Sequence, residues 1–287
     1  MAERAWQVPT DRTEATARLD ALVREHRFTI AVVFPLVGAV TLLASAEGLL
    51  PPPLAFNPFF VLFGTLVMRL PLVAGVFPLL DRKATAALVA LTAYSYGIEL
   101  YGVTTGWPYG EFGYGVDLGP MLFGEVPLGL PVFFFPLVLN AYLLVLLLLG
   151  RRAESTPVRL LATLATVMLV DLVLDPGAVA IGFWSYEIEQ FYGVPWQNYQ
   201  GWLLSGTVAV LLFDWGFDRA GLRRRLEQCE FMLDDLVSFV LLWGGINAFY
   251  ANWVPVGLAM LLGAGLLWTD RFDFDLSETR LGRAVWR

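Results

Sequence analysis

Residues 126–149, VPLGLPVFFFPLVLNAYLLVLLLL, form a long apolar stretch without a charged residue. A helix needs about 20 consecutive apolar residues to cross the hydrocarbon core of a bilayer, and this stretch meets that length. It therefore predicts a transmembrane helix near the middle of the chain. A chain of 287 residues that is 57% hydrophobic is typical of a membrane bundle rather than of soluble domains.

Seven further apolar stretches flank this one on both sides, and most approach the length of a membrane span. They cover residues 28–50, 58–80, 84–104, 158–181, 202–217, 231–250 and 253–268. Two of them, 202–217 and 253–268, are short, and a re-entrant pair formed by the last two stretches would keep their flanks on one side of the membrane. We expect an all-α, polytopic membrane bundle of about eight transmembrane helices.

The basic residues between the stretches predict the orientation. Of the 19 Lys and Arg residues, 18 lie in the two tails or in alternate connections, and Arg69 lies inside a stretch. Positively charged loops stay on the cytoplasmic side of a membrane. We therefore expect a multi-pass protein of the cell membrane, with a cytoplasmic N-terminal tail (1–27), a transmembrane domain (28–268) and a cytoplasmic C-terminal tail (269–287).

Composition argues against several classes of function. The net charge is −7, and the basic residues are scattered among acidic ones, which favours contacts with membrane lipid over nucleic-acid binding. With one histidine, His26, and one cysteine, Cys229, the chain cannot assemble a His/Cys metal site or an internal disulfide. Its one lysine, Lys83, lies in a connection, where it cannot form the buried Schiff base of a retinal protein.

Four ionisable residues lie deep within predicted spans: Arg69, Glu99, Asp171 and Asp175. A rise of about 1.5 Å per residue places all four in the middle-to-outer half of the membrane. Such groups cost roughly 2.5 kcal/mol or more each to insert, so they usually face the bundle interior and often mark function. One interpretation is an Arg69–Asp171 ion pair that only holds helices together. The other assigns Arg69 and one carboxylate to orientation and leaves another carboxyl protonated as an acid.

Other polar residues in or near the spans are expected to be structural. Aspartates near the cytoplasmic helix ends, beside Arg219 and residues 223–225, are expected to form interfacial ion pairs; they are Asp214, Asp218, Asp234 and Asp235. Asn140 and Asn247 are expected to form hydrogen bonds between helices.

Two connections on the predicted outer side, 105–125 and 182–201, are rich in aromatic residues. Residues 105–115 read TGWPYGEFGYG, and residues 184–202 read WSYEIEQFYGVPWQNYQGW. A single aromatic residue at a membrane edge is equally well explained by the interfacial aromatic belt. The glycines and prolines between these rings impose tight turns, however, and predict loops folded over the bundle as a lid. An aromatic cavity beneath such a lid suits an extended apolar ligand or a developing carbocation.

These composite motifs resemble a known family, the membrane carotenoid hydratases, specifically the haloarchaeal bisanhydrobacterioruberin hydratases. The resemblance rests on Glu99, TGWPYGEFGYG, Gly119-Pro120, Val126-Pro127, Asp171-x-x-x-Asp175-Pro176, Trp184-x-Tyr186 and YGVPWQNYQGW. It implies addition of water to the terminal C=C bonds of bisanhydrobacterioruberin, a long acyclic carotenoid, to give bacterioruberin without a cofactor or metal. Association with a carotenoid prenyltransferase is a further expectation.

Hydration of this kind needs an acid, a surface that stabilises a tertiary carbocation, and an activated water molecule. Asp175 is the first candidate for the acid and Glu99 the second. Asp171 would act as a base or electrostatic partner, and Arg69 would set the protonation pattern. Substrate-binding side chains are expected to be Trp107, Tyr109, Trp184, Tyr186, Trp196, Asn198 and Trp202.

Two alternatives remain open. In an intramembrane prenyltransferase acting on isoprenoids, Asp171-x-x-x-Asp175 and Asp214-x-x-x-Asp218 would bind Mg²⁺ and diphosphate, although the two pairs lie at opposite levels of the bilayer. A proton-coupled carrier would also bury acids and an arginine, but it needs an aqueous path from both sides. The apolar cytoplasmic half of the spans argues against the carrier.

Overall fold

The computed structural model describes residues 11–274, and most of them are helical. The principal helices, in chain order, are α1 (Arg12–Phe28), α2 (Phe34–Ala46), α3 (Pro58–Val76), α4 (Arg82–Thr105), α5 (Leu130–Leu149), α6 (Thr156–Ala180), α7 (Trp196–Gly216), α8 (Arg219–Gln228), α9 (Asp234–Phe249) and α10 (Trp253–Trp268). Short helical turns adjoin them at Thr29–Val33, Phe77–Leu79, Gly150–Glu154 and Glu230–Leu233.

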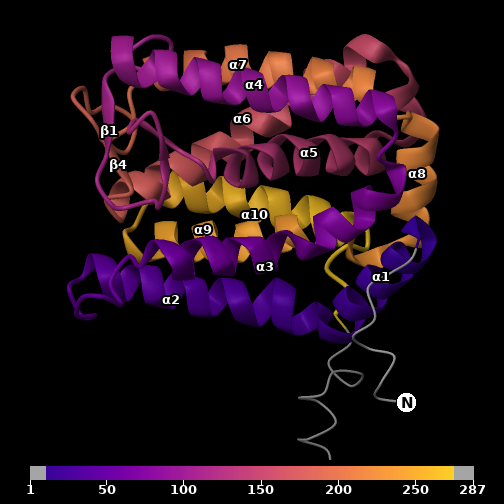
Figure 1. The fold of residues 1–287 in the computed structure, drawn as a ribbon, viewed down its shortest axis with the longest axis horizontal. Helices are drawn as coiled ribbons and strands as arrows, with labels where there is room; N and C mark the ends of the chain where they lie inside the picture. Colours follow the sequence, from indigo (N-terminus) through magenta and orange to yellow (C-terminus); the bar gives the residue numbers. More distant parts are fainter. Residues whose placement is uncertain (1–10, 275–287) are drawn as a thin grey trace, which may run out of the picture.

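All eight predicted apolar stretches contain a helix, and the long helices run side by side (Figure 1). Six segments between residues 11 and 274 are long and apolar enough to cross a membrane; they are Arg12–Ala46, Pro58–Leu79, Arg82–Thr105, Leu130–Glu154, Thr156–Ala180 and Glu230–Phe249. The shorter apolar helix α10 and the 21-residue α7 account for the other two stretches. The bundle is confirmed, and the number of crossings stays a prediction.

Helix starts follow the polar residues between the apolar stretches. The carboxylate of Asp81 accepts a hydrogen bond from the backbone N–H of Ala84 at 2.7 Å, which caps α4. Asp11 caps α1 in the same way through Glu14 at 2.8 Å. Residues 12–27, expected to be part of a polar tail, therefore belong to helix α1, which continues into α2.

The prediction of an all-α chain needs one correction, because the aromatic loops contain two short antiparallel sheets. Strands β1 (Phe112–Tyr114) and β4 (Trp184–Tyr186) pair across the two loops, and β2 (Met121–Leu122) pairs with β3 (Val126–Pro127). Aromatic residues alternate with glycine or serine in β1 and β4, which is the period of a half-buried strand.

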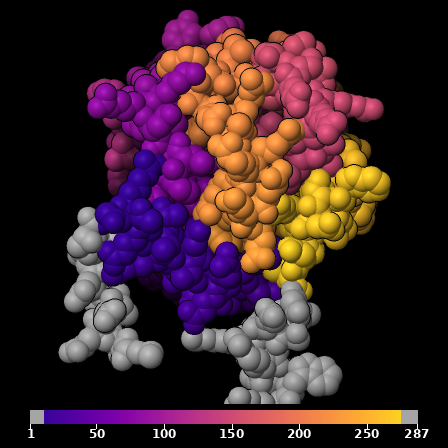
Figure 2. All heavy atoms as spheres, turned by 90° about the vertical axis from the view of Figure 1, so that its right-hand side faces the viewer, coloured from indigo at the N-terminus to yellow at the C-terminus, as the bar shows by residue number. Residues whose placement is uncertain are grey.

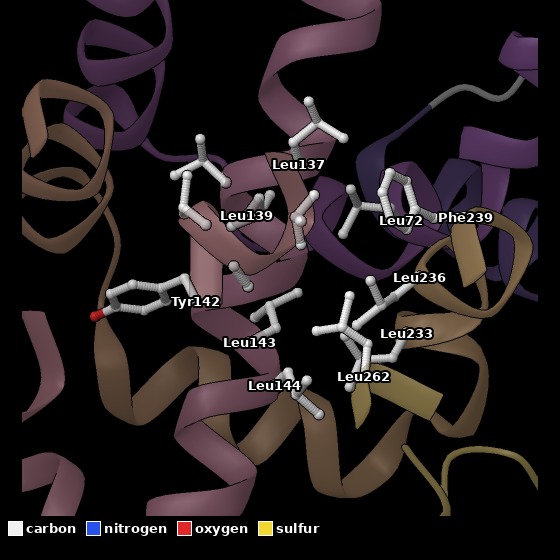
Figure 3. Packing of buried hydrophobic residues seen from close by; sticks show 14 of the residues in the cluster. Leu72, Leu137, Leu139, Tyr142, Leu143, Leu144, Leu233, Leu236, Phe239 and Leu262 are labelled. Carbon is white, nitrogen blue, oxygen red and sulfur yellow. The ribbon is translucent and has the colours of Figure 1, made fainter. Parts of the chain in front are cut away.

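Helix α5 lies at the centre of the core, where every residue from 136 to 146 is buried. Figure 3 shows how leucines of α5 pack with Leu72 of α3, Leu236 and Phe239 of α9 and Leu262 of α10.

The basic connections gather at one end of the bundle, which we call the arginine end. It carries α1, α8 and the connections after α3 and α5, and Figure 2 views the molecule from this side. Arg225 of α8 donates to Asp20 of α1 at 2.6 Å and to the Gly75 carbonyl at 3.1 Å. Phe28 and Phe274 also meet here, with ring centroids 6.1 Å apart. Both described ends of the chain therefore lie on one side; the basic residues Arg4, Arg280, Arg283 and Arg287 lie outside the described residues.

Candidate functional site

The two aromatic loops meet at the opposite end of the bundle, and together we call them the lid (residues 105–125 and 182–201; Figure 1). In the β1–β4 ladder, Phe112 pairs with Tyr186 and Tyr114 with Trp184. Side chains alternate between the two faces of a strand, so these four rings share one face. The pair between them, Gly113 and Ser185, is exposed on the other face.

Two glycines allow the backbone of the lid to pack closely. A Cβ atom at Gly115 would lie 2.3 Å from the Gly182 carbonyl oxygen, in the other loop. A Cβ atom at Gly201 of α7 would lie 2.3 Å from the Tyr109 ring. Both distances are far below van der Waals contact. The two loops of the lid can therefore pack against each other, and against α7, only because these positions have no side chain.

Beneath the lid lies a cavity of about 150 Å³. A cavity of about this volume in another protein holds benzene, so the site accepts a small apolar group. Its wall is mainly aromatic and aliphatic, and its polar members are Arg69, Glu99, Asp175 and Asn198, with the tyrosines of the lid. The structure thus brings predicted acids from α4 and α6 to one site.

Glu99 of α4 is held by the lid. The hydroxyl of Tyr114 donates a hydrogen bond to Glu99 Oε1. Burial, followed by the charge of Glu99, raises the pKa of Tyr114, so this phenol stays neutral and remains a donor. One oxygen of Glu99 is therefore engaged, and a contact between lid and helix orients the carboxyl group in the cavity wall.

Asp175 of α6 also receives one hydrogen bond, which comes from α7. Asn198 Nδ2 donates to Asp175 Oδ2, and both residues are 2% exposed. One helical turn earlier lies Asp171, which is fully buried and does not line the cavity. Neither oxygen of Asp171 has a hydrogen-bond partner among the residues the structure describes. Two carboxyl groups on one buried face favour a shared proton over two negative charges.

The Arg69–Asp171 ion pair of the first interpretation does not form. Arg69 Nη1 binds Asp235 Oδ1 at the start of α9, and Arg69 Nε donates to the Val132 carbonyl at 3.3 Å. Asn140 Nδ2 donates to the other oxygen of Asp235 at 2.6 Å. The charge of Arg69 is therefore compensated on the side of the arginine end, away from the Asp171–Asp175 pair.

The other structural aspartates find partners that differ in part from those predicted. Asp234 pairs with Arg27 at 2.7 Å, so neither Asp234 nor Asp235 pairs with the α8 arginines. Asp214 pairs with Arg159 at 2.6 Å. Hydrogen bonds between helices are confirmed for Asn140, as above, and for Asn247, which donates to the Val173 carbonyl at 2.8 Å.

Five of the seven predicted substrate-binding residues line the cavity: Tyr109, Trp184, Tyr186, Asn198 and Trp202. The other two lie outside it. Trp107 is half exposed and packs edge-on against Tyr101, with ring centroids 5.9 Å apart. Trp196 is equally exposed and stacks on Phe191. Both belong to the outer surface of the lid.

Sequence reasoning did not single out several residues of the cavity wall. They include Phe112, Tyr114, Phe134, Phe183 and Trp243. The alternation Phe-Gly-Tyr in 112–114 carried a signal, because a strand places its first and third side chains on one face. Trp243 and Phe134 lie within apolar helices, where sequence alone does not distinguish a cavity wall from ordinary core.

A metal centre receives little support from this geometry. Within residues 11–274, no three His, Cys, Asp or Glu side chains come together as a set of metal ligands. Asp214 is paired with Arg159, and Asp218 caps α8 through the N–H of Gly221 at 2.8 Å. The two Asp-x-x-x-Asp pairs therefore do not form a joint diphosphate site.

Comparison with known proteins places the chain in a family. A family model described as carotenoid biosynthesis protein matches residues 56–266, which is most of the chain. The chain belongs to the carotenoid biosynthesis protein family. Another carotenoid biosynthesis protein, the bisanhydrobacterioruberin hydratase of Haloarcula japonica, is 84% identical over 282 residues, which cover 98% of this chain and 96% of the relative. No solved structure matches. The resemblance inferred from the motifs is confirmed.

Proposed function

We propose that the chain is a hydratase that adds water to the terminal C=C bonds of bisanhydrobacterioruberin to give bacterioruberin. The observation that carries this proposal is the 84% identity, over nearly both full lengths, to a bisanhydrobacterioruberin hydratase. The cavity is chemically consistent with it, because carboxyl groups and aromatic rings enclose a space for one small apolar group. A terminal isoprenoid unit matches that space, while the rest of a long polyene extends beyond it.

The reaction has two steps that balance without an oxidant or reductant. An acid transfers a proton to the less substituted alkene carbon, so that the π bond breaks, a C–H bond forms and a tertiary carbocation remains. A water oxygen then forms the C–O bond, and a base removes the surplus proton from that oxygen. One water molecule is added in total, and transfer of the proton from base to acid restores the enzyme.

Asp175 is the proposed acid. It lines the cavity, and the hydrogen bond from Asn198 engages one of its oxygens and leaves the other to carry a proton. Asp171 lies one turn behind it, and no described residue supplies it with a counter-charge, which favours a protonated pair over two buried anions. Asp171 is therefore an electrostatic partner that does not contact the substrate.

Glu99 is the proposed base that activates water. It lines the same cavity from α4, and Tyr114 orients it through one oxygen. The rings of Trp184, Tyr186 and Trp202 would stabilise the carbocation, because aromatic faces attract positive charge. Arg69, bound to Asp235, is a positioning residue that shapes the deep wall of the cavity.

Neither alternative function has comparable support. The prenyltransferase lacks a joint Mg²⁺–diphosphate site among the described residues, and the burial of residues 136–146 of α5 argues against the aqueous path that a carrier needs. Location in the cell membrane with multiple crossings, cytoplasmic tails, and association with a carotenoid prenyltransferase stay predictions.

The test is expression in cells that accumulate bisanhydrobacterioruberin, with ¹⁸O-labelled water supplied and carotenoids analysed by mass spectrometry. We expect the native chain to yield ¹⁸O-labelled alcohols and Asp175→Asn to yield none. The matched control is Glu125→Gln, an exposed lid residue that should retain full labelling.

Each outcome decides a separate point. If Asp175→Asn still yields labelled product, hydration remains the proposed reaction, and Glu99 or Asp171 becomes the proposed acid. Absence of label with the native chain, despite folded protein in the membrane, would contradict hydration itself and make carrier activity the next hypothesis to test.

A further inference from the structure

A second hollow, of about 500 Å³, lies on the outer surface of the lid. In contrast to the cavity beneath, polar side chains line most of it: Thr104, Thr105, Glu111, Ser185 and Glu187. The backbone N–H of Glu187 donates to the Glu111 carbonyl at 3.1 Å, which extends the β1–β4 ladder to the rim. A polar depression of this size beside exposed carboxylates holds water.

The hollow and the cavity share part of their walls. Phe112 and Tyr186 line both spaces. They are a cross-strand pair of β1 and β4, with ring centroids 6.0 Å apart, and each is half-buried. Because both residues border both spaces, this cross-strand pair forms the partition between the hollow and the cavity.

We propose that the Phe112–Tyr186 pair is the gate through which the water consumed in the reaction passes from the outer hollow into the cavity. This inference rests on the proposed hydration and deepens it by assigning a route to the second substrate. Rotation of two rings on a two-stranded ladder opens the partition, and no displacement of a membrane helix is needed. The carotenoid, in contrast, reaches the cavity from the bilayer.

The opposite route is closed by packing. Below the cavity, residues 136–146 of α5 are all buried, and Figure 3 shows mostly aliphatic side chains packed in this region. Its polar members Asn140 and Tyr142 donate hydrogen bonds to Asp235 and Asp214. Arg69 lines the cavity, and its Nη1 is engaged by Asp235. Water from the arginine end would have to break this buried ion pair, which makes that path costly.

Tyr186 is suited to pass water onward. Burial is the main cause that raises the pKa of Tyr186, and the nearby carboxyl groups of Asp175, Asp171 and Glu99 add to it. The hydroxyl is therefore neutral, and a neutral phenol can both donate to and accept from water. A water molecule that passes this ring arrives between the proposed acid and the proposed base.

The experiment blocks the hollow chemically. Ser185→Cys in a Cys229→Ser background places the one thiol of the chain at the rim, because Cys229 is the only native cysteine. The thiol is modified either with methyl methanethiosulfonate, which adds a small group, or with a methanethiosulfonate that adds a bulky charged group. Hydration is then measured by ¹⁸O incorporation. Glu227→Cys in the same background, at the arginine end, receives the same bulky reagent as the matched control.

We expect the bulky group at Ser185→Cys to lower kcat at least tenfold without changing the KM for the carotenoid. The methyl group, and the bulky group at Glu227→Cys, should leave both constants unchanged. Unchanged kcat under the bulky group would overturn the gate, and so would a rise in KM alone, which would make the hollow the carotenoid's route.

A second variant covers the case in which Ser185→Cys is inactive before modification. Gly113→Cys then serves instead, because Gly113 lines the same hollow and, apart from its two chain neighbours, no described residue has an atom within 4 Å of the place a Cβ atom would take. The same two outcomes, an unchanged kcat or a rise in KM alone, would overturn the gate. Loss of ¹⁸O incorporation in the unmodified native chain would instead reject the proposed function.

Discussion

At the scale of single residues, the partner of each buried carboxyl group distinguishes its role. Glu99 and Asp175 each accept one hydrogen bond from a neutral donor and face the cavity, whereas Asp235 is bound by a guanidinium and an amide. A neutral donor orients a carboxyl group and leaves its proton free to move. A guanidinium fixes the carboxyl group as an anion. The first two residues are therefore suited to proton transfer and the third to structure.

The Tyr114–Glu99 hydrogen bond gives the first prediction. Tyr114→Phe removes the donor that orients Glu99, and a hydrogen bond to a charged group contributes about 1.5–3 kcal/mol. We expect kcat for hydration to fall roughly tenfold or more, with little change in the KM for the carotenoid. The control is Tyr101→Phe, an exposed tyrosine of the same region outside the cavity wall. Equal rates for the two variants would remove Tyr114 from the mechanism.

The Arg69–Asp235 pair gives the second prediction. Arg69→Met leaves a fully buried aspartate without its counter-charge, which typically costs about 3–5 kcal/mol. We expect a clear drop in the unfolding temperature in detergent. The double variant Arg69→Met/Asp235→Leu should recover most of it and retain hydration. A stable but inactive single variant would show instead that Arg69 takes part in the reaction.

Sequence identified these residues but not all of their partners. Counting depth along α3 placed Arg69 near the midplane, where Asp171 was the nearest expected carboxylate. An arginine side chain extends several ångströms from its Cα atom, however, and here it points toward the arginine end. The rotation of α3 against α9 decides the pairing, and helical periodicity in a uniformly apolar span does not reveal that rotation.

At the scale of elements, the glycine, proline and aromatic content of the two loops explains part of the structure of the lid. Glycine and proline predicted folded loops, and the structure adds that the two loops pair with each other through β1 and β4. That pairing joins residues about 70 positions apart in the sequence, and nothing local in either loop specifies it. The alternation of rings and small residues predicts which side chains face inward once the pairing is known.

Gly115 and Gly113 test the lid as a matched pair. A Cβ atom at Gly115 would lie 2.3 Å from the Gly182 carbonyl oxygen, whereas one at Gly113 would have no described residue within 4 Å apart from its two chain neighbours. Overpacking typically costs about 1–3 kcal/mol, so Gly115→Ala should displace the loops from each other. We expect Gly115→Ala to lose most hydration with an unchanged far-ultraviolet circular dichroism spectrum, and Gly113→Ala to behave as native. Similar activity of the two variants would contradict a fixed lid.

At the scale of the whole molecule, the two ends of the bundle differ in chemistry. Arginines hold α1, α8 and the neighbouring connections together at one end, and aromatic side chains close the other. The charge pattern predicted this polarity from the sequence, because it needs only the order of spans and loops. The number of crossings is harder to predict, since α7 and α10 are marginal in length or apolarity.

Thiol labelling tests the orientation. Burial raises the pKa of Cys229 to about 12, so the native thiol is neutral and enclosed at pH 7 and should not react. Glu227→Cys, nearby but exposed, should react with a membrane-impermeant maleimide only after cells are permeabilised, whereas Ser185→Cys should react in intact cells. The reverse pattern would invert the predicted topology.

The size of the cavity has a consequence for the time course of the reaction. A space of about 150 Å³ holds one terminus of a long polyene at a time. A substrate with two reactive termini must then dissociate, turn over in the bilayer and bind again before its second terminus is converted. Turnover should be distributive, so the singly hydrated product should build up first and decline as the doubly hydrated product appears. When substrate is in large excess over enzyme, almost all early product should have gained one water molecule.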